Sequence, residues 1–174
     1  ILLGTQMIAK GLDYHRVTLV AVLNADAMLV RNSFRATEDT FNLINQVSGR
    51  GGRGDLSSEL LVQSFDARHY AIILACEDEY VRFFNLEMNY RHLANYPPYS
   101  FLIRIVLSHH NEEVLDRMGP SELLKINRLY RRQIVLRSKN LDKMIDDYTS
   151  VHNNILDSLK GVRIAVDVNP MEIE

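Results

Sequence analysis

The first third of the chain alternates short apolar runs with one amphipathic segment. Residues 17–23 form a nearly continuous apolar run, which is typical of a parallel strand covered on both faces. Residues 34–47 carry apolar side chains at helical spacing, and Asn32 or Ser33 is placed to cap that helix. Residues 60–65 are expected to form another strand. This order of strand, helix and strand predicts α/β architecture with a parallel sheet for residues 1–68.

A helical segment follows and ends at two prolines. Residues 69–93 carry an apolar stripe at helical spacing, made of Tyr80, Phe83, Phe84 and Met88. We expect Tyr80, Phe83 and Phe84 to lie in a core rather than to form a platform for base stacking. The sequence Tyr-Pro-Pro-Tyr-Ser at 96–100 stops the helix, because proline lacks an amide donor and restricts the residue before it. We therefore expect connecting helices over 69–95 and a separate C-terminal domain over 96–174.

Within that C-terminal domain the apolar period changes to two. Residues 101–107, 130–137 and 162–168 alternate as half-exposed strands do, and a helix capped by Asn140 is expected over 141–159. Such strands with one good helix predict a small α+β domain. Alternation over 130–137 places Arg131 and Arg137 on the exposed face. It places Arg132 on the apolar face, where we expect it at an edge with its charged head in water.

Composition narrows the function only slightly. Apolar residues make up 47% and charged residues 24% of 174 residues, which is the balance of an ordinary globular chain rather than a disordered one. The net charge of −2 favours no class of partner. However, residues 125–143 carry seven basic residues and one acidic residue. That segment is either a solvated sheet face or a phosphate-binding surface.

Several kinds of site are not expected from the sequence. The single cysteine, Cys76, excludes an internal disulfide and a cysteine-based zinc site within this chain, and we expect it to be a small buried residue. The six histidines show no pairs at helical spacing, so no metal site is predicted. No apolar run approaches the roughly 20 residues that cross a bilayer, so no membrane partner is predicted.

The most informative stretch is the glycine-rich loop after the first helix. Residues 46–53 read Gln-Val-Ser-Gly-Arg-Gly-Gly-Arg, so a helix end leads into a loop with Arg50 and Arg53 three residues apart. Two planar guanidinium groups on a tight turn suit a triphosphate whose charge spreads during transfer. On glycine and arginine content alone, a surface turn with solubilising arginines is the better explanation of the loop.

The complete pattern is more specific. Gln-x-x-Gly-Arg-x-x-Arg at 46–53 resembles motif VI of superfamily 2 helicases, and residues 4–13 resemble motif V of the same superfamily. Together with further matching segments, the chain resembles the C-terminal half of the PriA-type replication-restart helicases nearly end to end. Those segments are residues 24–27, 34–36, 69–72, 96–100, 119–120 and 167–170. Two departures are Leu12, where that family has histidine, and the direct step from Met118 to Gly119, where it has a longer segment.

The resemblance implies a role for each motif residue. It implies that residues 1–68 are the second half of the second RecA-like helicase lobe. Arg53 matches the arginine finger that reaches the γ-phosphate, and Arg50 matches its companion. Gln46 matches the residue that senses the nucleotide. Gly11 and Asp13 match positions near the ribose and the lobe interface, and Thr5 and Gln6 match positions that contact the tracked DNA strand.

The implied function is that of an ATP-dependent DNA helicase that restarts replication at stalled or forked DNA and assembles the primosome. ATP with Mg²⁺ would be shared with another lobe, and zinc would be bound elsewhere in such a protein. Partners would be forked or single-stranded DNA, single-stranded-DNA-binding protein and other primosome proteins, in the bacterial cytoplasm near the nucleoid. Beginning at Ile1, the chain is expected to be a fragment that binds DNA or partners but does not hydrolyse ATP. The alternatives are a stand-alone DNA- or protein-binding module, or a related motor acting on RNA or duplex DNA.

Overall fold

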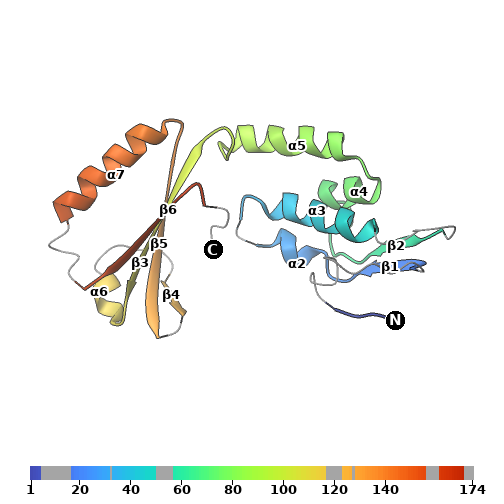
Figure 1. The fold of residues 1–174 in the computed structure, drawn as a ribbon, viewed down its shortest axis with the longest axis horizontal. Helices are drawn as coiled ribbons and strands as arrows, with labels where there is room; N and C mark the ends of the chain where they lie inside the picture. The colour runs from blue at the N-terminus through green and yellow to red at the C-terminus, as the bar shows by residue number, and fades with distance from the viewer. Residues whose placement is uncertain are drawn as a thin grey trace. The chain divides into compact units, whose positions relative to one another are not determined.

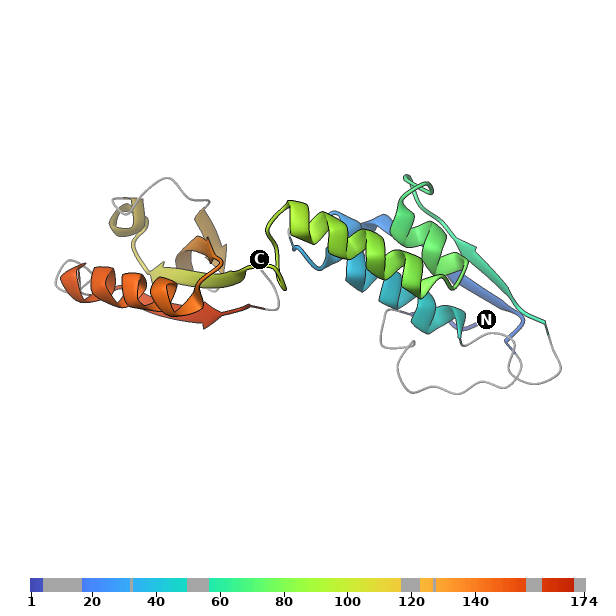
Figure 2. The ribbon, with the colours of Figure 1, turned by 90° about the horizontal axis from the view of Figure 1, so that it is seen from above.

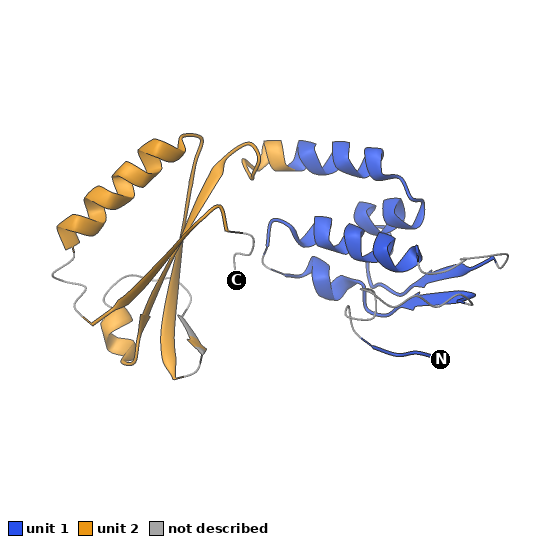
Figure 3. Cartoon of the chain, in the orientation of Figure 1, with its two compact units in different colours: residues 1–90, 174 blue, residues 91–173 orange. Residues whose placement is uncertain are grey.

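The computed structural model describes residues 1–4, 17–31, 33–49, 57–116, 123–126, 128–155 and 161–170. The chain forms two compact units, residues 1–90 and 91–173, which divide within one helix (Figure 3). Figures 1 and 2 show the elements from two directions. In chain order these are β1 (Leu19–Val22), α2 (Asp26–Leu29), α3 (Ala36–Ser48), β2 (Glu59–Val62), α4 (Tyr70–Cys76), α5 (Tyr80–Leu93), β3 (Phe101–His109), α6 (Glu112–Asp116), β4 (Leu123–Ile126), β5 (Leu129–Ser138), α7 (Leu141–Ile155) and β6 (Arg163–Val168).

The first unit contains a small parallel sheet. Strands β1 and β2 pair in parallel, with Leu19 opposite Glu59 and Val22 opposite Val62. This direction confirms the parallel α/β prediction for this part of the chain. Alternate residues of both strands are exposed. Leu19 and Leu61, on the same face, are 57% and 56% exposed, so β1 is not covered on both faces as its apolar run predicts.

The other face of this sheet packs against a helical core. Val22, Leu60 and Val62 contact a buried cluster that draws residues from α3, α4 and α5. Within it, the rings of Phe41 and Phe83 are stacked with their centroids 4.0 Å apart. Of the apolar stripe predicted on α5, Phe83 is buried, whereas Tyr80 and Phe84 are largely exposed. The prediction that all of them lie in the core is therefore only partly met.

The segment 69–93 is helical as predicted, but it is interrupted at residues 77–79. The backbone N–H of Glu79 donates to the carbonyl oxygen of Leu74 at 2.9 Å, and Asp78 adopts a positive φ of 56°. Such a bond around a left-handed residue closes a helix, and glycine is the usual residue there. Because aspartate takes that position, the sequence gives no clear signal of the break. Cys76, the last residue of α4, is exposed rather than buried.

The second unit is built around a four-stranded sheet with the order β4-β5-β3-β6. Every neighbouring pair in it is antiparallel. The elements follow one another as strand, helix, strand, strand, helix, strand, which is the split βαβ arrangement. The helix after β5 begins as predicted, since Asn140 Oδ1 accepts a hydrogen bond from the backbone N–H of Lys143 at 2.9 Å. This unit confirms the α+β prediction.

The two faces of this sheet differ in character. Ile103, Ile105 and Leu107 of β3 form a buried cluster with Leu115 of α6 and Met144 of α7. Because side chains alternate along strands, their neighbours belong to the opposite face, which we call the open face. On strands β3, β5 and β6, the pairing register gives the open face Leu102, Arg104, Val106 and Ser108 of β3, Arg131, Gln133, Val135 and Arg137 of β5, and Arg163, Ala165 and Asp167 of β6.

The position of Arg132 differs from the prediction. It lies on the helix-covered face, as alternation requires, but its charged head is not in water. The side chain is 9% exposed, and Nη2 donates to Asp116 Oδ1 of α6. Strand β5 is not at an edge, because β4 pairs along its other side, with Leu123 opposite Arg132. A buried guanidinium needs a charged partner, and α6 supplies one.

Candidate functional site

The C-terminal end of α3 carries the described part of the candidate nucleotide site. Gln46 lies in the last turn of this helix with its side chain exposed. The carbonyl oxygen of Asn45 accepts hydrogen bonds from Ser48 Oγ at 2.9 Å and from the backbone N–H of Gly49 at 3.2 Å. The helix ends at Ser48 with Gly49 as its C-cap, immediately before Arg50 in the sequence.

The other motif candidates lie outside the described residues. These are Thr5, Gln6, Gly11, Asp13, Arg50 and Arg53. Their expected roles at the nucleotide and at the DNA strand therefore stay predictions. Gln46 alone among the motif V and VI candidates has a described position, one turn before the loop that holds the two arginines.

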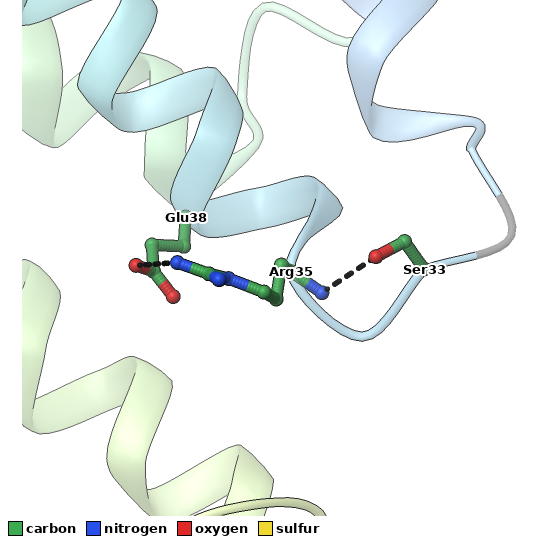
Figure 4. Close-up of polar contacts among 3 residues, drawn as sticks. All are labelled: Ser33, Arg35 and Glu38. Atoms are coloured by element: carbon green, nitrogen blue, oxygen red, sulfur yellow. Dashed lines mark hydrogen bonds and ion pairs between the residues drawn. The ribbon is translucent and has the colours of Figure 1, made fainter. Parts of the chain in front are cut away.

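Polar contacts of Arg35 fix the start of the same helix (Figure 4). Arg35 Nη2 donates to Glu38 Oε1 at 3.1 Å, and the backbone N–H of Arg35 donates to Ser33 Oγ at 3.2 Å. The Ser33 hydroxyl thus stabilises the turn that precedes the helix. The N-cap residue is Arg35, and its side chain forms no cap bond. The buried Thr40 hydroxyl donates to the carbonyl oxygen of Ala36 at 2.8 Å. Together these bonds hold the first turns of α3.

Asp26 connects the carboxyl ends of the two parallel strands. Its carboxylate accepts hydrogen bonds from Ser64 Oγ at 2.7 Å, from the backbone N–H of Phe65 at 2.8 Å and from that of Asp66 at 3.2 Å. The bond from the Ser64 hydroxyl, followed by that from the Phe65 amide, holds the pKa of Asp26 below its usual value. Asp26 therefore secures the loop that follows β2.

The arginines on the open face of the second unit differ in whether a carboxylate compensates their charge. Arg104 Nη2 donates to Asp167 Oδ2 on the neighbouring strand at 3.2 Å, so these two charges compensate each other. Nearer the other end of the face, the register places Arg131 and Arg163 opposite Ser108, one on each side. Among the residues that the structure describes, neither of these two arginines has an acidic partner.

Arg137, the other DNA-binding candidate, is exposed but engaged within its own unit. Its Nη1 atom donates to the carbonyl oxygen of Ala94, and its guanidinium carbon lies 4.4 Å from the centroid of the Tyr96 ring. The two predicted DNA-binding arginines are thus not equivalent. Arg131 is the one whose donors remain available to a ligand.

Metal-binding groups and membrane-spanning helices are both absent from the described ranges. In those ranges, no three histidine, cysteine, aspartate or glutamate residues are grouped closely enough to hold a metal ion. None of the described helices has the length and apolar character needed to cross a membrane.

Sequence reasoning missed two residues of the C-terminal unit. Arg163 falls on a predicted strand, but its position beside Ser108 and across from Arg131 depends on how β3, β5 and β6 pair. Asp116 carries no signal of its role in the sequence, because only the fold brings α6 to Arg132. The alternation over 162–168 was the signal that could have put Arg163 on the exposed face.

Comparison with known proteins identifies the chain. No family model matches it. Among curated proteins, it is 36% identical over 200 residues to the replication restart protein PriA of Bacillus subtilis, an alignment that covers 98% of the chain. The chain corresponds to part of a PriA-family protein. Other PriA relatives are 46% identical over 106 residues in Chlamydia pneumoniae and 30% identical over 195 residues in Synechocystis.

The chain spans about a quarter of the curated relatives that it matches along nearly its whole length. It covers 24% of the B. subtilis protein and 23% of the Synechocystis protein. Both alignments run over more residues than the 174 of this chain, so these relatives contain residues within the aligned region that this chain lacks.

Proposed function

We propose that this chain is part of an ATP-dependent DNA helicase that acts at stalled or forked DNA to restart replication. The observation that carries the proposal is the similarity to PriA replication restart proteins along essentially the whole chain. The parallel pair β1 and β2, with α3 between them in the chain, is consistent with the second half of a RecA-like lobe.

In this proposal α3 directs the chain into the nucleotide site. Arg53 acts as the arginine finger on the γ-phosphate of ATP, and Arg50 assists it. Gln46, on the last turn of the helix, senses the nucleotide, while Gly11 and Asp13 lie near the ribose. ATP and Mg²⁺ are also held by a lobe whose lysine and carboxylate motifs the chain does not contain.

The proposed DNA contacts lie in both units. Thr5 and Gln6 contact the strand along which the motor moves. Arg131 contacts the phosphate backbone from the open face of the C-terminal sheet, whereas Arg137, the other candidate, is held by the carbonyl oxygen of Ala94 and the ring of Tyr96. Single-stranded-DNA-binding protein and other primosome proteins are the proposed protein partners, in the bacterial cytoplasm near the nucleoid.

A second candidate function is a stand-alone DNA- or protein-binding module. The C-terminal unit favours it, because it has a hydrophobic cluster and a complete four-stranded sheet of its own. In that case the glycine-arginine loop would have no catalytic role, and Arg53 would be dispensable in the complete protein.

The purified chain tests the proposed function directly. We expect it to bind fluorescein-labelled fork DNA in an anisotropy titration, with affinity that falls as salt rises. We also expect no ATP hydrolysis above background, with or without DNA, because the arginine finger completes a site whose metal-binding and phosphate-binding groups are elsewhere. Measurable DNA-stimulated turnover would contradict the fragment proposal, and an absence of DNA binding would contradict the role given to the open face.

A further inference from the structure

We propose that one end of the open face, rather than the whole face, holds the phosphate groups of the DNA. The site is a row across three strands, with Arg131 of β5 and Arg163 of β6 on either side of Ser108 of β3. This inference rests on the proposed function and specifies which residues of the C-terminal unit bind the DNA. We call these three residues the phosphate row.

The row is defined by strand pairing. Neighbouring strands lie about 4.8 Å apart, so the two arginines, separated by β3, have backbones about 10 Å apart. Both side chains point to the same side of the sheet, because both residues pair with Ser108. Ser108 itself is buried and polar. The two guanidinium groups on either side of it form a pair of donor groups suited to the oxygens of a polyanion, and Ser108 separates them.

Charge along the open face favours this row over the others. Arg104 is already neutralised by Asp167, which lies four residues from Arg163 along β6 and therefore about 13 Å away. Arg137, at the far end of β5, is engaged with Ala94 and Tyr96. Arg128 is exposed in the turn immediately before β5, at the same end of that strand as Arg131. Free positive charge is thus concentrated at one end of the face.

The composition of the face indicates an extended backbone rather than a base. The row next to the phosphate row is formed by Gln133, Val106 and Ala165, whose side chains are uncharged. None of the described residues that make up the open face is aromatic, so the stacking platform that sheets use to bind single-stranded bases is missing there. We therefore expect contacts with phosphates, independent of base sequence.

The test compares two charge-matched double variants of the full chain in salt titrations of fork-DNA binding. Arg131→Ala/Arg163→Ala removes the phosphate row. Lys139→Ala/Lys143→Ala removes the same number of charges from the basic segment 125–143, to which Arg131 also belongs, at positions outside the open face. For the arginine variant, we expect the slope of log affinity against log salt to become shallower by about two, since each lost contact contributes about 0.9. The lysine variant should keep a slope close to that of the unaltered chain.

Each outcome separates this inference from the proposed function. If the unaltered chain binds but both variants lose the same slope, binding depends on general charge and the phosphate row is wrong. An unchanged slope in the arginine variant also overturns the phosphate row, while DNA binding by the chain still stands. If the unaltered chain does not bind fork DNA, the phosphate row and the DNA-binding role of the open face both fail. The proposal that the chain is part of a helicase, which rests on the similarity to PriA, is then tested by Arg53 instead. Circular dichroism checks folding, and Arg131→Gln/Arg163→Gln, which keeps polar side chains, replaces the alanine variant if that variant is unfolded.

Discussion

The guanidinium of Arg137 lies over the ring of Tyr96, with 4.4 Å between its central carbon and the ring centroid. The same group donates a hydrogen bond to the carbonyl oxygen of Ala94. Strand β5 is thereby tied to the segment between α5 and β3. A residue that the sequence assigned to DNA thus has two structural partners, Ala94 and Tyr96.

Replacing Arg137 is therefore expected to affect stability. Arg137→Ala removes a cation–π contact and a hydrogen bond, and should lower the free energy of unfolding of the C-terminal unit by about 1 kcal/mol. Arg137→Lys should restore only part of this, because lysine lacks the planar fork. Urea unfolding followed by circular dichroism measures the change. Arg131→Ala serves as the control on the same face of β5, and equal losses in the two variants would contradict the structural role of Arg137.

The ion pair between Arg132 and Asp116 gives a second test of the C-terminal unit. Asp116→Asn should lower the free energy of unfolding by about 1 to 2 kcal/mol, because the charge that compensates the buried Arg132 is lost while half of Asp116 faces solvent. Glu113→Gln, on the same helix, is the matched control and should have almost no effect. If both substitutions left the urea midpoint unchanged, α6 would not hold Arg132 as described.

Asp26 predicts a pH dependence in the first unit. Its pKa is lowered in the folded chain by the Ser64 hydroxyl and the Phe65 amide. A carboxylate with a depressed folded pKa stabilises the fold above its unfolded pKa of about 3.9, and this contribution is lost as pH falls through the folded value. Stability should therefore decline below about pH 4. In Asp26→Asn that part of the decline should be absent, and identical pH profiles for the two proteins would refute the assignment.

Much of this fold follows from local patterns in the sequence. The alternation over 130–137, the cap at Asn140 and the prolines at 97 and 98 each act within a few residues, so the elements they define are found where expected. The parallel direction of β1 and β2 follows from the helix that separates them in the chain.

Features that depend on distant residues were not predicted. The partner of Arg132 is 16 residues away, and the phosphate row is assembled from three strands. The end of α4 escaped prediction because Asp78 occupies a left-handed position that glycine usually takes. The expected roles of Arg50 and Arg53 at the nucleotide rest on resemblance alone, since both residues lie outside the described part of the chain.

Arg53 in the complete protein tests the central claim, that this chain supplies the arginine finger of a DNA-stimulated ATPase. We expect Arg53→Ala to lower kcat by about 10³ or more while nucleotide affinity changes little, because the group acts mainly on the transition state. Arg53→Lys should recover little of the activity. The control is Arg82→Ala, which replaces an exposed arginine of α5 that contacts Glu77. This variant should hydrolyse ATP at the normal rate. Near-normal DNA-stimulated hydrolysis by Arg53→Ala would contradict the claim.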